Sequence, residues 1–350
     1  MRKTMLVLLL GLSIFSCKKE KGETATLSGL EYAKFEQTDA NGKVNKLYVI
    51  RNAAGMEVAI TNMGARIVSI LVPDKDGNMK NVMKGYDNIQ PYLQLTDYKG
   101  AVLGRYAGRI SEKGINIDRV KYTLRTNENK TMLNGGPRGF STQYFTIEQN
   151  AANSLSCNYL SKHNEEGFPG NLDLQVAYTL TDSNELVIAY DAFTDRGTFA
   201  NITNQMHFNL SGADAMSVTD QSLFVDALTY LETDENKIPT GKIIPVRGTE
   251  FDFTEARPVS SSYDLTLIWN KDDSAGDKLA AKLSSATTGI NVEVYTTEPG
   301  VYLMTPDQST VVLQTQHFPD SPNQEAFPST VIRPDQPFKS RTIYKFGIEK

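Results

Sequence analysis

The segment Leu172-Asp-Leu-Gln-Val-Ala-Tyr-Thr-Leu180 decides the fold, because apolar side chains occupy every second position across it. Successive side chains of a β-strand point to opposite faces of a sheet. A period of two therefore predicts a strand with one buried face and one polar face. The nearby run Leu186-Val-Ile-Ala-Tyr-Asp-Ala-Phe193 has the same β-forming composition.

Short runs of this kind recur along the body of the chain, at 47–51, 56–61, 67–72, 290–296, 311–315 and 342–348. Turn sequences such as Asn41-Gly42 and Pro239-Thr-Gly241 separate them. Helical periodicity is nearly absent, and residues 278–283 are the best short helical candidate. Many short strands without a composition break predict one all-β domain, a large sandwich or barrel, over residues 29–350.

Composition excludes several classes of protein. The 350 residues carry 36 Lys+Arg and 41 Asp+Glu, a formal net charge of −5, and no long basic block, so we expect no nucleic-acid partner. Two cysteines cannot build a disulfide framework or a cysteine-based zinc site. Three histidines leave little material for a metal centre. We expect neither a metal nor an organic cofactor.

The N-terminus has the pattern of an export signal. Arg2 and Lys3 precede an apolar run at 5–15, which spans only about 16 Å as a helix and is too short to cross a membrane. The ending Ile14-Phe-Ser-Cys17 resembles a bacterial lipobox. That resemblance implies a signal peptide at 1–16, a lipidated Cys17, and a polar tether over 17–28. The alternative is an ordinary signal peptide in which Cys17 is incidental.

Cys157 would then be the thiol left without a lipid. It lies within the alternating run Ser154-Leu-Ser-Cys157, and we interpret it as a small apolar core residue. A role as a nucleophile is the alternative interpretation.

No common catalytic motif is present, but eight strings occur in an order that resembles the aldose 1-epimerase (galactose mutarotase) family. They are Gly104-Arg-Tyr-Ala-Gly-Arg-Ile110, Leu133-Asn-Gly-Gly136, Glu165-Glu-Gly-Phe-Pro-Gly170, Asn201-Ile-Thr-Asn-Gln-Met-His-Phe-Asn-Leu210, Ile238-Pro-Thr-Gly241, Gly248-Thr-Glu-Phe-Asp-Phe253, Glu293-Val-Tyr-Thr-Thr-Glu-Pro-Gly300 and Leu313-Gln-Thr-Gln-His-Phe-Pro-Asp-Ser-Pro-Asn323. The resemblance runs from about residue 30 to the C-terminus. It implies a large antiparallel β-sandwich with an open cleft for a monosaccharide.

The family interconverts sugar anomers, and this reaction needs one group to take a proton from the anomeric hydroxyl while another protonates the ring oxygen. The resemblance implies a glutamate base, a histidine acid and a second histidine. Here the base position is Gln314, the acid position is Gln205, and Asn134 replaces the second histidine. None of the three histidines of this chain falls at either catalytic histidine position.

Other sugar-holding positions are partly kept. The resemblance implies that Arg109 and Asp264 contact the sugar, whereas Tyr302 stands where the family has a glutamine and Gly108 where it has an asparagine. We therefore predict Arg109, Asn134, Gln205, Asp264, Tyr302 and Gln314 as substrate-binding residues. Arg109 and Asp264 also have a structural interpretation, as a buried ion pair or a pair at a strand edge.

Amide side chains donate and accept hydrogen bonds but do not titrate near neutral pH, so Gln205 and Gln314 cannot perform the family's proton transfer. His207 is a possible substitute, because residues two apart on a strand share a face. His317 is better explained as a structural residue, and His163 as an exposed loop residue.

Three functions follow. The first is an exported, membrane-anchored lipoprotein, on the periplasmic or surface face of a bacterial envelope, that binds a monosaccharide or oligosaccharide without efficient mutarotation. The second is an active epimerase, or an enzyme acting on a related sugar, with a relocated acid/base pair. The third is a non-catalytic envelope interaction module. A decayed cleft without any ligand remains the structural alternative.

Overall fold

The computed structural model describes residues 23–94, 97–259, 262–270 and 278–349. The segment that opened the sequence analysis forms β14 (Leu172–Leu180), and its burial alternates as expected, with Leu172, Leu174, Val176, Tyr178 and Leu180 all inside. All eight of the strand segments identified in the sequence are strands in the structure. The strand pairs between named strands are antiparallel, and the prediction of a large antiparallel β-sandwich is confirmed.

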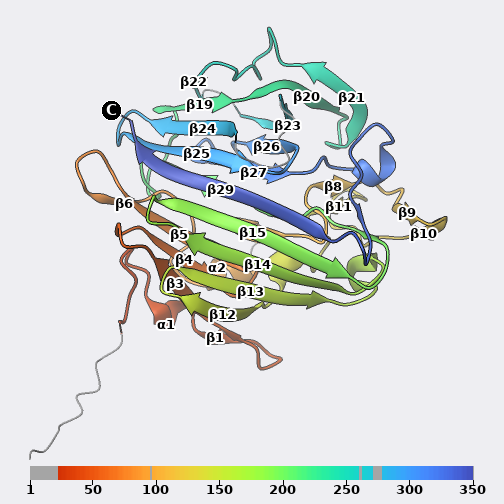
Figure 1. Ribbon diagram of the computed structural model, residues 1–350, viewed down its shortest axis with the longest axis horizontal. Coiled ribbons are helices and arrows are strands. Elements are labelled where there is room, and N and C mark those ends of the chain that lie inside the picture. The colour runs from red at the N-terminus through yellow and green to blue at the C-terminus, as the bar shows by residue number, and fades with distance from the viewer. Residues whose placement is uncertain (1–22, 95–96, 260–261, 271–277, 350) are drawn as a thin grey trace, which may run out of the picture.

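The largest sheet holds nine strands and crosses the whole molecule (Figure 1). Its strands, in spatial order, are β12 (Thr146–Ala151), β13 (Ser154–Ser161), β14, β15 (Glu185–Thr194), β29 (Phe338–Ile348), β25 (Ile290–Thr296), β24 (Leu279–Ser285), β19 (Gln221–Val225) and β22 (Arg257–Pro258). The C-terminal strand β29 pairs with β15 and β25, so it joins the two halves of this sheet.

Two further sheets contribute to the same core. The six-stranded sheet contains β18 (His207–Phe208), β27 (Val311–Gln316), β26 (Gly300–Met304), β23 (Asp264–Trp269), β20 (Ala227–Thr233) and β21 (Pro239–Pro245). The four-stranded sheet contains β3 (Leu47–Arg51), β4 (Glu57–Thr61), β5 (Arg66–Pro73) and β6 (Met79–Asn81). One hydrophobic cluster includes side chains from all three sheets, among them Ile60, Val176, Val294 and Leu313.

The described segments also contain five separate two-stranded sheets. They are β1 (Gln37–Thr38) with β2 (Val44–Asn45), β7 (Val102–Leu103) with β17 (Thr203–Asn204), β8 (Arg109–Ile110) with β11 (Met132–Leu133), β9 (Ile115–Ile117) with β10 (Val120–Tyr122), and β16 (Thr198–Phe199) with β28 (Val331–Ile332). The described helices are single turns: α1 (Tyr32–Phe35), α2 (Gln90–Gln94), and the 3-10 turns Phe140–Thr142, Glu165–Gly167 and Ser321–Asn323. No helix of the described segments is long and apolar enough to cross a membrane.

The helical prediction for residues 278–283 is wrong, because this segment lies in β24. Strands β19 and β25 pair with its two edges and bury Ala280, Ala281 and Leu283. An isolated helix of six residues is too short to be stable, whereas a central strand gains hydrogen bonds on both sides. Cys157 is fully buried in β13, which confirms its interpretation as a core residue, and burial raises the pKa of its thiol.

The signal peptide at 1–16 and Cys17 lie outside the described residues, as does the tether up to residue 22. Residues 23–28, the last six of the predicted tether, are bound to the sandwich, so the tether prediction is wrong for them. Backbone N–H groups of Leu27 and Ser28 donate to the two carboxylate oxygens of Glu57, at 3.0 and 3.1 Å. Glu57 is fully buried, and Arg51 bridges it to Glu23. A charge inside β4 thus holds the N-terminal segment against the sandwich.

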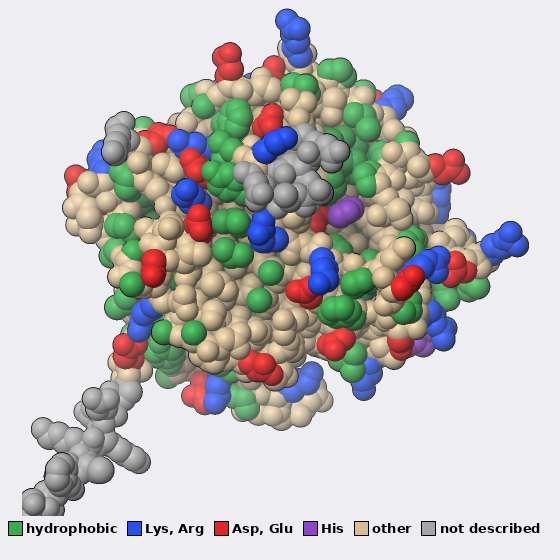
Figure 2. All heavy atoms as spheres, in the orientation of Figure 1, with side chains coloured by type: hydrophobic (Ala, Val, Ile, Leu, Met, Phe, Trp, Pro, Cys, Tyr) green, Lys and Arg blue, Asp and Glu red, His purple; other side chains and the backbone are tan. Residues whose placement is uncertain are grey.

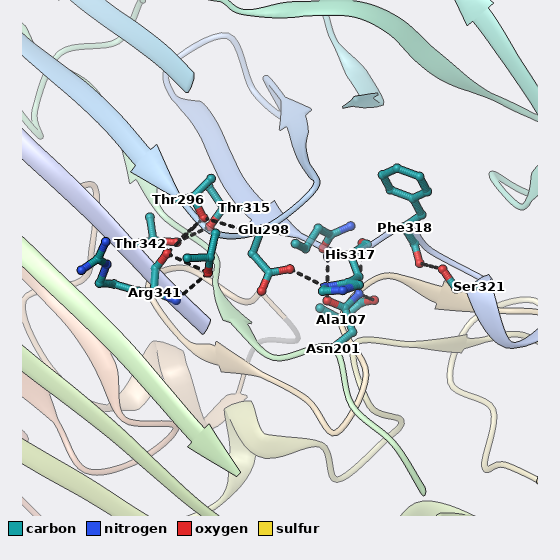
Figure 3. A network of polar contacts seen from close by, with 12 residues as sticks. Ala107, Asn201, Thr296, Glu298, Thr315, His317, Phe318, Ser321, Arg341 and Thr342 are labelled. Atoms are coloured by element: carbon teal, nitrogen blue, oxygen red, sulfur yellow. Dashed lines mark hydrogen bonds and ion pairs between the residues drawn. The ribbon is translucent and has the colours of Figure 1, made fainter. Parts of the chain in front are cut away.

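A second polar network fixes the chain around residue 317 (Figure 3). The side chain of Asn201 accepts from the backbone N–H of His317 at 3.0 Å and donates to the carbonyls of His317 and Ala107 at 3.2 and 3.0 Å. The ring of His317 meets the buried carboxylate of Glu298 at 2.6 Å. These contacts support the structural role predicted for His317. They also tie the end of β27 to the loop before β8.

Replacing Glu57 with alanine should release the N-terminal segment. The substitution leaves two backbone N–H groups and the Nε of Arg51 without their acceptor, so we expect a loss of about 2 kcal/mol in the free energy of unfolding. Chemical denaturation measures this loss, and limited proteolysis should cut near residue 28 several-fold faster than in the parent. An unchanged cleavage rate at this segment would contradict the role of Glu57.

The His317–Glu298 pair should make stability depend on pH. Burial acts to lower the pKa of His317, but the carboxylate of Glu298 outweighs it, and the net pKa is raised. The pair's contribution is therefore fully present below the unfolded-state pKa of about 6.5, and it is lost as pH rises through the higher folded value. The Tm advantage over His317→Gln should be larger at pH 6 than at pH 9. An advantage that does not change with pH would rule out the charged pair.

Candidate functional site

An open cavity of about 410 Å³ lies against one face of the six-stranded sheet and is bordered by the loops around residues 98, 108 and 134. All six residues predicted to bind substrate line this cavity, and so does His207. These seven residues come from seven elements and turns: Arg109 from β8, Asn134 after β11, Gln205 after β17, His207 from β18, Asp264 from β23, Tyr302 from β26 and Gln314 from β27. The structure brings every one of them together.

The register of three neighbouring strands builds the cavity floor. Thr266 of β23 lies opposite Tyr302 of β26, and Tyr302 lies opposite Gln314 of β27. Residues that face each other across paired strands project to the same side of a sheet. One row therefore presents a hydroxyl, a phenol and an amide to the cavity, and Gln314 is almost fully buried at its end.

Gln205 is held beside Gln314 by the core. Its neighbour Asn204 accepts a hydrogen bond from the hydroxyl of Tyr190 at 2.6 Å and donates to the carbonyl of Gly100 at 3.0 Å. The backbone of Gln205 is bonded to Ala101 and to Gly100. This anchoring lets Nε2 of Gln205 donate to Oε1 of Gln314 at 3.1 Å.

The two amides belong to a hydrogen-bond chain with a defined direction. Nε2 of Gln314 donates to Oε1 of Gln316 at 2.5 Å. Gln205 donates through its nitrogen, so its Oε1 is left to accept from Nε2 of His207 at 3.0 Å. This assignment places the imidazole proton on Nε2. The other ring nitrogen, Nδ1, is 3.5 Å from the hydroxyl of Thr310. The expected shared face of Gln205 and His207 is present.

His207 is neutral at physiological pH. It is 4% exposed. Burial, with a further effect from the nearby Lys99 cation, lowers its pKa to about 3. A general acid or base is most effective when its pKa lies near the working pH. With both ring nitrogens in contact with protein groups, His207 positions Gln205 and is poorly suited to proton transfer.

Arg109 and Asp264 do not pair with each other, so the buried ion pair considered for them is absent. Arg109 donates from Nε and Nη2 to the two oxygens of Glu128, at 2.5 and 3.0 Å. Asp264 accepts from the hydroxyl of Tyr302 and lies 3.5 Å from the ammonium of Lys237. Burial, followed by the Asp264 carboxylate, raises the pKa of Tyr302. Both residues predicted to contact the sugar thus lie on the cavity wall, each held by a neighbouring side chain.

Asn134 supports the turn that carries Arg109. Its side-chain Oδ1 accepts from the N–H of Gly108 at 2.8 Å, and its N–H donates to the carbonyl of Gly108 at 3.0 Å. Gly108 has a φ of +77°, and an added Cβ would lie 3.1 Å from the ring of Pro319. A side chain at position 108 would therefore crowd the ring of Pro319.

Sequence reasoning missed several charged residues of the wall, notably Asp97, Lys99, Lys237 and Asp307. Lys99 donates to Asp97 at 2.9 Å, and Tyr86 donates to the same carboxylate. Burial acts to raise the pKa of Asp97, but these two hydrogen bonds outweigh it and the pKa is lowered. These residues lie in turns and connections where neither alternation nor a motif distinguishes them, so the sequence carried no signal for them.

Several titratable groups line the cavity. Where burial or a neighbour shifts the pKa of one of them, the pKa moves further away from 7. Burial opposes the shift of Asp307, but hydrogen bonds from Ser309 lower its pKa. The pKa of Lys99 is raised, because Asp97 outweighs the effect of burial. Together with His207 and Tyr302, these groups surround the two amides with side chains that donate and accept hydrogen bonds.

On the face of the molecule drawn in Figure 2, basic and acidic side chains are interspersed and form no continuous basic area. Within the described segments, no three His, Cys, Asp or Glu side chains gather in a way that could hold a metal ion.

Comparisons with known proteins agree with the resemblance found in the sequence. The family model for aldose 1-epimerase matches residues 46–345. The chain is 34% identical to the galactose mutarotase of Homo sapiens over 317 residues, covering 84% of this chain and 92% of that protein. It is 32% identical to the aldose 1-epimerase of Escherichia coli (strain K12) over 339 residues, covering 88% and 97%.

A solved structure gives the same fold. The GalM/aldose epimerase homologue from C. elegans superposes with a TM-score of 0.83 at 24% identity, covering 87% of this chain and all of that one. The family match spans most of the chain, and the identity to full-length relatives exceeds 30%. This chain therefore belongs to the aldose 1-epimerase family.

Proposed function

We propose that this protein is a carbohydrate-binding lipoprotein that holds its sugar without efficient mutarotation. The observation that carries the proposal is the hydrogen bond from Gln205 to Gln314 on the cavity floor. The resemblance puts the family's acid and base at these two positions. Two amides read hydroxyl groups well, since each offers donors and an acceptor, but neither exchanges a proton near pH 7.

The rest of the wall suits a sugar ligand. Arg109 and Asp264 supply charged partners for hydroxyl groups, and charged partners make stronger hydrogen bonds than neutral ones. Leu133, Leu265 and Met304 add apolar surface for the carbon face of a sugar ring. A few convergent polar groups on an otherwise apolar lining are typical of small-molecule sites.

Two other functions have less support. An active epimerase with a relocated acid/base pair would need a group that titrates near neutrality, and His207, with a pKa of about 3, does not meet this need. A purely protein-binding envelope module would favour a filled or apolar cleft. The open cavity with Arg109 and Asp264 on its wall counts against it.

We expect the protein to bind a sugar and to leave mutarotation uncatalysed. Isothermal titration against a panel of common hexoses, pentoses and their disaccharides should give heat with at least one member. Arg109→Ala should weaken that binding by about tenfold, because it removes a charge-assisted hydrogen bond. Absence of heat with every sugar would refute the proposal.

Polarimetry on fresh α-glucose and α-galactose tests the lack of turnover in the same preparation. The parent protein should relax these solutions no faster than buffer. The double variant Gln205→His with Gln314→Glu provides the matched control, because it restores two titratable groups and should accelerate relaxation. Catalysis by the parent would revive the enzyme hypothesis.

The proposal places the protein in a bacterial envelope through a lipid on Cys17, on the periplasmic or surface side. The sequence pattern at 14–17 is its support. Full-length protein expressed in a lipoprotein-processing bacterium should fractionate with membranes, and Cys17→Ser should move it to the soluble fraction. Mass spectrometry should find an acylated N-terminal peptide beginning at Cys17. An unmodified peptide would refute the anchor without affecting the sugar site.

A further inference from the structure

A hollow of about 860 Å³ opens beside the segment where the described chain begins. Most of its lining comes from residues 27–30, from β5 and β6, and from the turn at 211–216. Three of the exposed large apolar side chains of the described segments border it: Leu27 is 60% exposed, Met79 is 41% exposed and Met216 is 80% exposed. Single exposed apolar residues are ordinary on a protein surface, but a cluster around one hollow marks an interaction site.

The N-terminal segment is fixed at the rim of this hollow. Glu57 binds its backbone, and the hydroxyl of Ser28 lies 2.9 Å from that of Ser69 in β5. Further back along the chain, Arg51 holds the carboxylate of Glu23 at 2.9 Å. Figure 1 shows the described chain beginning on the side of the molecule where β3 to β6 lie. Residues before Glu23 are therefore attached to this side of the sandwich.

The chain between the proposed lipid anchor and the sandwich is short. Glu23 follows Cys17 by six residues, and an extended chain covers at most about 3.5 Å per residue, so its reach is about 20 Å. The lipid on Cys17 would lie in the hydrocarbon core, and the headgroup layer takes up about 6 Å of that reach. A sandwich held so close to the bilayer has to turn the side that carries its N-terminal segment toward the lipids.

The charges around the hollow are balanced. Its charged lining consists of Lys80, Lys84, Lys99, Asp87, Asp214 and Asp307. Attraction to anionic lipids depends on an excess of basic side chains near the surface, and this lining has none. Contact with a bilayer would therefore depend on the apolar side chains. Methionine suits such a contact, because its unbranched chain adapts to irregular surroundings.

We propose that this face docks on the lipid bilayer, with Leu27, Met79 and Met216 inserted among the headgroups and the upper part of the acyl chains. The partner of the hollow is thus the surface of the membrane in which the protein is anchored. This inference rests on the proposed lipid anchor and adds to it the orientation of the sandwich on the membrane.

A fluorescent label at position 216 tests the inference. Full-length protein that carries its lipid is reconstituted into vesicles of phosphatidylcholine and phosphatidylglycerol, and Met216→Cys is labelled with an environment-sensitive fluorophore. Cys157 is fully buried and Cys17 is acylated under the proposal, so the new thiol takes the label. Lipids with a nitroxide on the upper acyl chain should quench this label several-fold. Its emission should also shift to shorter wavelengths, because the label lies at the boundary of headgroups and acyl chains.

Phe193→Cys with the same label is the matched control. Phe193 is 51% exposed and lines neither this hollow nor the candidate cavity. It lies near the end of β15, whose arrowhead points away from β6 in Figure 1. The control label should keep the emission of a label in water and show little quenching. If Met216→Cys fails to fold, Met79→Cys places the label on the same rim.

Each other outcome overturns a defined part of the proposal. Equal quenching at the two positions, in a preparation with an acylated N-terminal peptide, would overturn the docking and leave the anchor intact. A shifted emission at position 216 without quenching by the lipids would also overturn it, because protein would then cover the hollow. Quenching that disappears in vesicles of phosphatidylcholine alone would overturn the apolar contact. Absence of the acylated peptide would overturn the anchor, and the docking with it.

Discussion

The register of β23, β26 and β27 is the constraint on which the candidate site depends. Because side chains alternate between the two faces of a sheet, a slip of one residue would turn Tyr302 and Gln314 toward the core and their apolar neighbours toward the cavity. Leu303 and Leu313, opposite each other on the same two strands, are fully buried. The burial of these leucines therefore fixes the register, and the register positions the polar row. The same strand register therefore determines both the packing of the core and the placement of the polar row on the cavity floor.

The hydrogen bonding of the cavity floor, where Gln205 and Gln314 lie, depends on the neighbouring His207. A single neutral imidazole, His207, joins the amide chain and orients Gln205, which in turn orients Gln314. Because Nε2 of Gln205 donates to Gln314, its Oε1 accepts from His207, and this sets the direction of each hydrogen bond in the chain. A fixed set of donors and acceptors can select among hydroxyl arrangements. It differs from an acid/base pair, whose members must exchange a proton during each turnover.

The sequence predicted much of this protein. Alternation identified the strands, and the order of eight family strings identified the residues that now line one cavity. Its errors concern segments where local pattern and tertiary context disagree. Residues 278–283 carry a weak helical pattern but form β24 between two strand partners. Residues 23–28 have the composition of a linker, yet the buried Glu57 binds the backbone of this segment. Backbone hydrogen bonds do not depend on side-chain type, so composition cannot predict them.

By itself, the sequence determined the β architecture and put amides at positions 205 and 314, where the resemblance implies the family's acid and base. These are properties of residue type and spacing. Only the tertiary structure decided that His207 is buried and bonded to Gln205, and that Arg109 pairs with Glu128 instead of Asp264. Such features depend on burial and on contacts between residues far apart in the chain, and local sequence patterns do not encode either.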